Sequence, residues 1–307
     1  MNHVVLRSPG DRIAARFSRR TAAVVLSLGV VLLASVFASL CLGSRATPPA
    51  AVLEALLVPG DGARSFIVNE LRLPRVVLAV LVGAAFAVAG LLLQALVRNP
   101  LASPDVIGVT GGGSVAAVVF LAVQGTAFPV HRLPPVAMTG AAASALLIVA
   151  LAWQRGVTPT RLVLIGVGIA AAMGAVTTLV MVLNPDTTTL QAYVWLIGSL
   201  YAAQWREVQG IVPWFALCLP VALFHARHMD ALALGDGVAA GLGVNVMRTR
   251  LVVLSASVVL AGAAVAFAGG IGFVGLMAPH IARRLTRGGS RVADTPGCCW
   301  SPPWWAQ

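Results

Sequence analysis

The chain alternates between apolar runs of membrane-crossing length and short polar connections. One run, residues 76–97, lies between the pair Arg72 and Arg75 and a sharp turn at Asn99-Pro100. A helix needs about 20 mostly apolar residues to cross a bilayer. Helices satisfy their own backbone groups in lipid, and these continuous runs lack the alternation of membrane β-barrel strands. The sequence therefore predicts an all-α fold, a polytopic transmembrane helical bundle.

About eight segments are predicted to enter the membrane, each judged by length and apolar content. One of them is interrupted by Gly111, Gly112 and Gly113. The last is too short to cross the bilayer directly, so it predicts a helix of half depth. In chain order the predicted segments are residues 22–43, 76–97, 105–123, 134–152, 162–183, 208–225, 251–269 and 271–285.

Composition excludes several classes of protein. Apolar residues make up 59% of the chain and charged residues only 10%, whereas soluble domains have about 25% charged residues. The bilayer must therefore act as the solvent. All 21 basic residues are arginine, so the chain lacks the lysine of a P-loop ATPase. The net charge of +11 is scattered between apolar runs, which favours membrane topology and predicts no nucleic-acid partner.

The arginines also predict which way the chain is inserted. Cytoplasmic connections of membrane proteins carry an excess of positive residues. With the N-terminus in the cytoplasm, 15 arginines lie inside and 6 outside. The first apolar run is too long for a signal peptide and is predicted to be retained. We therefore expect a multi-pass protein of the cytoplasmic membrane. Arg72 and Arg75 lie outside against this trend, which favours a functional role.

Small residues recur along three segments at helix-packing spacing. Such stripes let helix backbones approach closely in lipid. Packing is the favoured interpretation, and lining of a pore is the alternative. The stripes are Ala79, Gly83 and Ala87; Gly166, Ala170 and Gly174; and Gly262, Ala266 and Gly270.

The connection at residues 226–250 differs from the others. It contains two helix-like pieces, Met229–Leu234 and Asp236–Leu242, separated by Gly235. Asp230 and Asp236 are candidates to cap the two N-termini. A short helix pair on the cytoplasmic face is suited to bind a soluble partner. A connector lying on the surface explains the same residues equally well.

The titratable residues point to no catalytic or metal chemistry. His225 and His228 share a helix face, but no third ligand follows at metal-binding spacing, so a pair at the membrane boundary is favoured. The four cysteines show no metal or disulfide pattern. No carboxylate lies inside a strong span, which disfavours a proton- or sodium-driven carrier. No nucleophile and base pair indicates a hydrolase, and no cofactor is predicted.

Five strings then occur in an order that closely resembles the FecCD-type permeases of ABC importers for iron-siderophores, haem and cobalamin. The resemblance covers about residues 20–291. The strings are residues 71–75, 98–102, 195–200, 233–244 and 272–283. The resemblance implies a transport subunit, not an enzyme, and favours an iron(III)-siderophore as cargo. Cobalamin and haem remain open, and an unrelated channel or exporter is the remote alternative.

The resemblance also implies partners and sites. It implies a second permease copy or a paralogue, an extracytoplasmic binding protein and separate ATP-binding subunits, all around a chain embedded in lipid. Arg72 and Arg75 match arginines that dock the binding protein. The ATPase-coupling positions are Asp230, Ala233, Leu234, Gly235, Asp236, Ala239, Gly241, Leu242 and Gly243, and the translocation-path positions are Gly166, Ala170, Met173 and Gly174.

The last residues depart from the family pattern. Family members have ten helices, and two of them follow the motif that ends at Arg283. Here residues 292–307 are rich in proline, tryptophan and cysteine, and proline does not extend a helix. We therefore expect a permease domain at residues 1–291 and an irregular tail at 292–307. A truncated or frame-shifted form of this kind is expected to transport poorly.

Overall fold

A computed structural model describes residues 3–7, 14–43, 46–58, 62–124, 132–153, 158–184, 186–201 and 203–286. Each of the eight predicted segments coincides with a helix, which confirms the all-α bundle. Six helices in these ranges are long and apolar enough to cross a membrane. They are α1 (Arg19–Cys41), α4 (Leu73–Val97), α6 (Leu133–Ala152), α7 (Pro159–Val182), α9 (Trp205–Ala233) and α11 (Val246–Ala268). Two shorter ones are α5 (Val109–Gln124) and α12 (Val274–Thr286).

Several short elements lie outside the predicted segments. Two strands, β1 (His3–Arg7) and β2 (Ala14–Ser18), pair antiparallel just before α1. The other short elements are α2 (Pro49–Leu57), α3 (Ala63–Phe66), a π-helical stretch η1 (Ile67–Arg72), α8 (Asp186–Ile197) and α10 (Asp236–Gly241). α3, η1 and α4 form one continuous helix of 35 residues.

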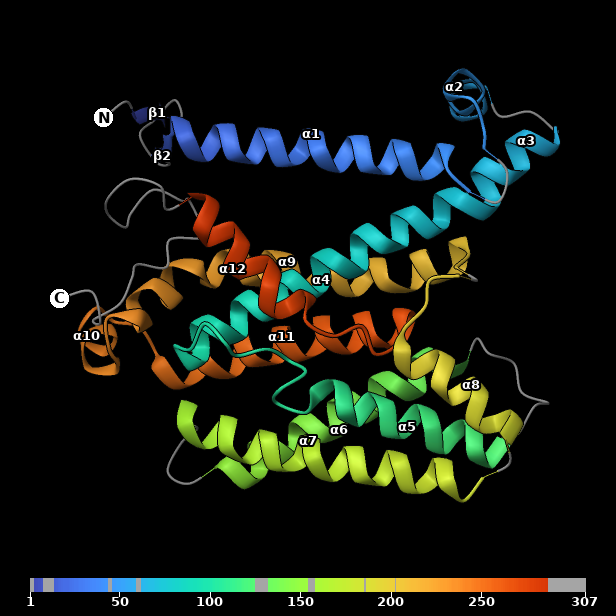
Figure 1. Ribbon diagram of the computed structural model, residues 1–307. Helices are drawn as coiled ribbons and strands as arrows, with labels where there is room; N and C mark the ends of the chain where they lie inside the picture. Colours follow the sequence, from blue (N-terminus) through green and yellow to red (C-terminus); the bar gives the residue numbers. More distant parts are fainter. Residues whose placement is uncertain are drawn as a thin grey trace.

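The bundle has two distinct ends (Figure 1). α2, α3 and α8 lie at one end, while the strand pair and α10 lie at the other. α4 and α11 cross the middle, and α11 is the more deeply covered, with 67% of its apolar window buried. α5, α6 and α7 pack on one side of this core. α1 lies on the opposite side and is only 6% buried over its window, so its surface is left for lipid or a partner.

α5 and α12 both begin inside the bundle, part of the way along their neighbours (Figure 1). Their starting points are joined, because the Asp105 carboxylate accepts a hydrogen bond of 3.2 Å from the backbone N–H of Phe273. Phe273 has a φ of 64° and Gly108 a φ of 85°, so both turns use left-handed backbone. The short helix predicted at residues 271–285 is present as α12, with 13 residues, and α5 is also short, with 16 residues.

The glycines of α4 and α12 bring these two helices into backbone contact. A Cβ built on Gly90 would lie 1.8 Å from the carbonyl oxygen of Gly275. Next to this contact the fully buried Gln94 donates from Nε2 to the carbonyls of Gly275 and Leu276, at 3.4 and 3.3 Å. Its Oε1 accepts a hydrogen bond from Arg283. Close packing and an amide bridge therefore fasten α12 to the core.

The three small-residue stripes differ in what they contact. A Cβ on Gly270 would lie 2.5 Å from the carbonyl oxygen of Leu196, and a Cβ on Gly166 2.9 Å from Ile107. Close packing is therefore confirmed at these two positions. A Cβ on Gly83 or Gly174 would have no such neighbour within 4 Å. The stripe at Ala79, Gly83 and Ala87 instead lines a cavity.

Candidate functional site

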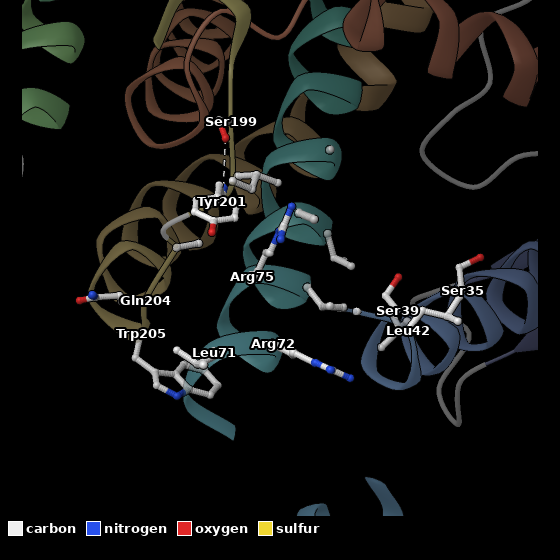
Figure 2. A pocket seen from close by; sticks show the side chains of 18 of the residues that line it. Ser35, Ser39, Leu42, Leu71, Arg72, Arg75, Ser199, Tyr201, Gln204 and Trp205 are labelled. Atoms are coloured by element: carbon white, nitrogen blue, oxygen red, sulfur yellow. Dashed lines mark hydrogen bonds between the residues drawn. The ribbon is translucent and has the colours of Figure 1, made fainter. Parts of the chain in front are cut away.

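A cavity of about 1,840 Å³ separates α1 from α4. Its walls are one face of α1, the helix from Phe66 to Ala87, residues 198–201, residues 203–206 at the start of α9, and Ile271. Ser35 and Ser39 contribute hydroxyl groups from α1 (Figure 2). The two arginines that the sequence singled out, Arg72 and Arg75, both line it. The structure therefore brings the predicted docking pair to one cavity.

Arg72 is engaged by the end of α1. Its Nη1 donates to the carbonyl oxygen of Leu40 at 2.6 Å, to that of Cys41 at 3.3 Å, and to Thr47 Oγ1 at 3.1 Å. The last carbonyls of a helix have no partner within the helix, and here the guanidinium supplies one. A Cβ at Gly43 would lie 2.7 Å from Arg72 Nη2, so glycine leaves room for this contact. Arg72 therefore holds α1 to the rest of the bundle.

Arg75 has different surroundings. Its guanidinium carbon lies 5.8 Å from the centre of the Tyr201 ring, a distance typical of a cation–π contact. Figure 2 shows Arg72 reaching toward α1, with Arg75 between Tyr201 and the serines of that helix. Arg75 is exposed, and Tyr201 retains 81% of its accessible surface. Of the two arginines, Arg75 is the more exposed.

Two hydrogen bonds join η1 to α2 and α9 at this end of the bundle. Asn69 Nδ2 donates to the carbonyl of Ala55 in α2 at 2.9 Å, and the Asn69 carbonyl accepts from Trp205 Nε1 of α9 at 3.0 Å. Sequence reasoning missed Asn69 and Trp205. No local sequence pattern marks either residue, because each forms its hydrogen bond with a residue at least 14 positions away. These bonds fix the rim of the cavity that carries Arg72 and Arg75.

At the other end, the connection at residues 226–250 corrects two predictions. α9 continues without a break to Ala233, so Met229–Leu234 is the end of a long helix and not a separate one. Asp230 therefore lies inside α9 and caps nothing. α10 begins at Asp236, but its N-cap is Gly235 and no side chain caps it. Asp230 has no capping role because the backbone N–H groups near the end of α9 are already bonded within that helix.

The Asp236 carboxylate instead binds two arginines. Arg250 Nη2 lies 2.9 Å from both Oδ1 and Oδ2, and Arg98 Nη2 contacts Oδ1. Arg98 ends α4 and Arg250 lies near the start of α11. Sequence reasoning singled out Asp236 but not its partners, which are 138 and 14 residues away.

The segment around α10 exposes apolar side chains. Leu234 at the end of α9, Val238 in α10 and Leu242 just after α10 retain 61%, 50% and 65% of their accessible surface. Ala239 is fully buried on the inner side. Val238 was not among the predicted coupling positions. Among those that were, Ala239 is buried, and the exposed ones are Leu234, Asp236, Gly241, Leu242 and Gly243. The glycines at 235, 237, 241 and 243 have open space around them.

The four predicted translocation-path residues of α7 lie in two different environments. Gly166, Ala170 and Met173 contact Ile107, Gly108 and Gly111 at the start of α5. Gly174 is exposed, on a helix that is only 11% buried over its apolar window. The structure therefore places Gly174 on an open face and the other three in a packing contact.

The histidine pair lies side by side on α9. The rings of His225 and His228 are 5.4 Å apart, and His225 Nδ1 lies 3.0 Å from the carbonyl of Val221. Among the residues that the structure describes, no group of three His, Cys, Asp or Glu side chains is placed to hold a metal. The predicted tail at residues 292–307 lies outside the described residues.

Comparison with known proteins identifies the scaffold. The model of the FecCD transport family matches residues 31–299. The achromobactin transport permease CbrC of Dickeya dadantii is 49% identical over 293 residues, which are 94% of this chain and 82% of that protein. The iron(3+)-hydroxamate permease FhuG of Bacillus subtilis is 40% identical over 270 residues, 86% of this chain and 80% of that protein.

A solved structure agrees. It is described as a metal-chelate type ABC transporter in an inward-facing conformation, and it superposes with a TM-score of 0.78 at 25% identity. The superposition covers 90% of this chain and 84% of that one. The resemblance seen in the five sequence strings is thus confirmed. The chain belongs to the FecCD transport family, as a multi-pass permease subunit of an ABC importer.

Proposed function

We propose that this permease imports an iron(III)-siderophore across the cytoplasmic membrane. The observation that carries the proposal is the 49% identity with a permease named for achromobactin transport, supported by the 40% identity with a permease for iron(3+)-hydroxamates. The test is uptake of radiolabelled iron by cells whose own permease gene is deleted and replaced by this one. Iron supplied as achromobactin or as a hydroxamate should accumulate above the level of the deletion strain, although the atypical residues 292–307 are expected to make transport slow. Accumulation of labelled cobalamin alone would contradict the proposal.

We propose that a binding protein delivers the chelate to the end that carries α2, α3 and α8. This end is on the far side from the N-terminal strands (Figure 1), and we infer that the N-terminus is cytoplasmic. Arg75 supports the docking because it is exposed beside Tyr201 at the cavity. Arg72 contributes by holding α1 and the rim in place. Guanidinium groups form strong, charge-assisted bonds with carboxylates of a partner.

Replacing Arg75 with Glu should weaken association with the binding protein by about tenfold or more, because attraction to acidic side chains becomes repulsion. The measurement is titration of the binding protein onto the permease in nanodiscs at low and high salt. Arg64→Glu is the matched control, since Arg64 is exposed on α3 at the same end. Equal loss in both variants, or none in Arg75→Glu, would count against a specific role for Arg75.

We propose that an ATP-binding subunit docks on the opposite end, against the face formed by Leu234, Val238 and Leu242. Apolar side chains exposed on a short helix and its flanking turns suit an apolar groove on a partner. These three side chains are exposed although they are apolar, which supports a surface covered in the assembly. Ala239, which is fully buried, supports this segment from the inner side. The remaining predicted positions, Asp230, Ala233, Gly235, Asp236, Gly241 and Gly243, complete the docking segment.

A cysteine at Val238 should form a crosslink to the ATP-binding subunit in membranes that contain both. Ala239→Cys provides the control, because residue 239 faces the bundle and is fully buried. Crosslinking of both variants in equal yield, or of neither, would show that this face does not touch the ATPase.

We propose that the open face of α7 pairs with a second permease copy or a paralogue. Leu164, Leu179 and Val182 on α7 retain 75%, 57% and 75% of their surface, and Gly174 lies exposed on the same helix. In such a dimer Gly174 would lie at the boundary between the two subunits, where the translocation path would run. Disulfide formation between two copies of a Gly174→Cys variant, in the absence of Cys298 and Cys299, tests the pairing.

A further inference from the structure

Three elements meet at one carboxylate, and one of them, α4, lies far from the other two in sequence. Asp236 begins α10, Arg98 ends α4, and Arg250 lies in the second turn of α11. Arg250 reaches both carboxylate oxygens at 2.9 Å, and Arg98 contacts Oδ1. α4 and α11 are the two helices at the middle of the bundle (Figure 1). Asp236 therefore links the short helix at the surface to the core.

α10 has few other means of holding its orientation. It has six residues, of which only Ala239 is buried. Left-handed glycines flank it, with φ of 119° at Gly235 and 82° at Gly243. Glycine adopts such backbone with little cost, so it provides little resistance to rotation. A helix this short between two such turns needs side-chain contacts to fix its direction.

The backbone conformation of Arg98 supports the same link. It has left-handed backbone, with φ of 56° and ψ of 33°, at the C-terminal end of α4. A residue other than glycine or asparagine in this conformation costs roughly 1 kcal/mol. Glycine is the residue that helix ends prefer here, but glycine would remove the guanidinium that binds Asp236. The arginine at this strained position is explained by its contact with the carboxylate.

We propose that Asp236 is a positioning residue that makes α10 move as one body with α4 and α11, so that displacement of α10 reaches the core of the permease. The mechanical role during transport rests on the proposed docking of an ATPase at α10. The Asp236 side chain is 49% exposed, and those of Arg98 and Arg250 are 32% and 11% exposed. The pair with Arg98 is largely solvent-accessible, and such ion pairs contribute little to global stability. We therefore expect the main effect of Asp236 to be on the direction of α10.

The first test needs no ATPase. Nitroxide labels at Val238 of α10 and Leu101 after α4 report the distance between the two elements, in a variant whose four native cysteines are replaced. Both positions are exposed, at 50% and 67%. The full chain in nanodiscs should give a narrow distance distribution, and Asp236→Ala should broaden it at least twofold. Arg248→Ala is the matched control on α11, since it removes an arginine of the same region that does not contact Asp236. Equal widths in all three proteins would overturn the inference.

The second test uses the complete transporter with its ATP-binding subunits. Asp236→Ala and Arg250→Ala should each lower the number of chelates imported per ATP hydrolysed by about threefold or more, within the range seen for coupling residues. ATP hydrolysis itself should persist, and the double variant should lose no more than the single ones. Asp236→Glu should retain most of the coupling. If no ATPase binds the wild-type chain, the proposed docking fails while the distance result still stands. Parallel loss of uptake and hydrolysis, or additive losses, would contradict the positioning role.

Discussion

Gly90→Ala should lower the melting temperature of the purified permease by roughly 5–10 °C, as expected for a loss of about 3 kcal/mol in a chain of this size. The added methyl group would lie 1.8 Å from the Gly275 carbonyl oxygen and 2.5 Å from its carbon. Both are backbone atoms, so no side-chain rotation relieves the overlap. α12 must move away from α4, and the bonds from Gln94 to Gly275 and Leu276 are lost with it. This cost exceeds the gain of about 1 kcal/mol that alanine brings within a helix.

Gly83→Ala is the matched control for this experiment. Gly83 lies seven residues earlier on α4, and a Cβ there would meet nothing within 4 Å. The same substitution should therefore be neutral or raise the melting temperature slightly. The measurement is thermal denaturation in detergent, followed by the loss of the monodisperse chromatographic peak. A similar melting temperature for both variants would show that α4 and α12 do not make this contact.

Arg72→Ala should loosen the end of α1. The guanidinium binds two carbonyls of α1 and the Thr47 hydroxyl, and hydrogen bonds to charged groups contribute about 1.5–3 kcal/mol. A loss of about 2 kcal/mol corresponds to roughly 30-fold faster local opening. Hydrogen–deuterium exchange of amides around residues 38–47 measures it. α1 is little covered by the rest of the chain, so few other contacts compensate.

Two further variants make the Arg72 experiment specific. Arg72→Lys retains the charge but not the three-way contact, and intermediate exchange is expected. Arg64→Ala removes an exposed arginine from the same end and should leave the exchange of residues 38–47 unchanged. Wild-type exchange in Arg72→Ala would mean that α1 is held by other means.

The membrane segments were predictable because each is specified by its own residues. Hydropathy alone located all eight helices, including the short one at residues 271–285, since a bilayer demands apolar length from each segment separately. The segment at 105–123 was placed correctly but its start was not. α5 begins only at Val109, because Gly108 turns the chain with left-handed backbone before the helix can form.

The short helices and the polar contacts were less predictable, because they depend on distant residues. α2 and α8 are too short for a periodic pattern to be distinguished from a loop. The end of α9 was predicted at residue 225, yet the helix continues to Ala233 because Met229 and Leu232 are buried against the bundle. Arg72 was recognised from its unusual side of the membrane, but its partners on α1 lie about 30 residues earlier. No local pattern reveals such a pairing.

The shared starting point of α5 and α12 has a consequence for the order in which the protein assembles. The carboxylate of Asp105 finds its backbone donor at Phe273, 168 residues later in the chain. Ribosomes deliver α5 to the membrane long before that partner exists. Irregular backbone at membrane depth is tolerated only where protein or water covers it. The turn before α5 therefore acquires its final architecture only after Phe273 has been synthesised and α11 and α12 have been inserted.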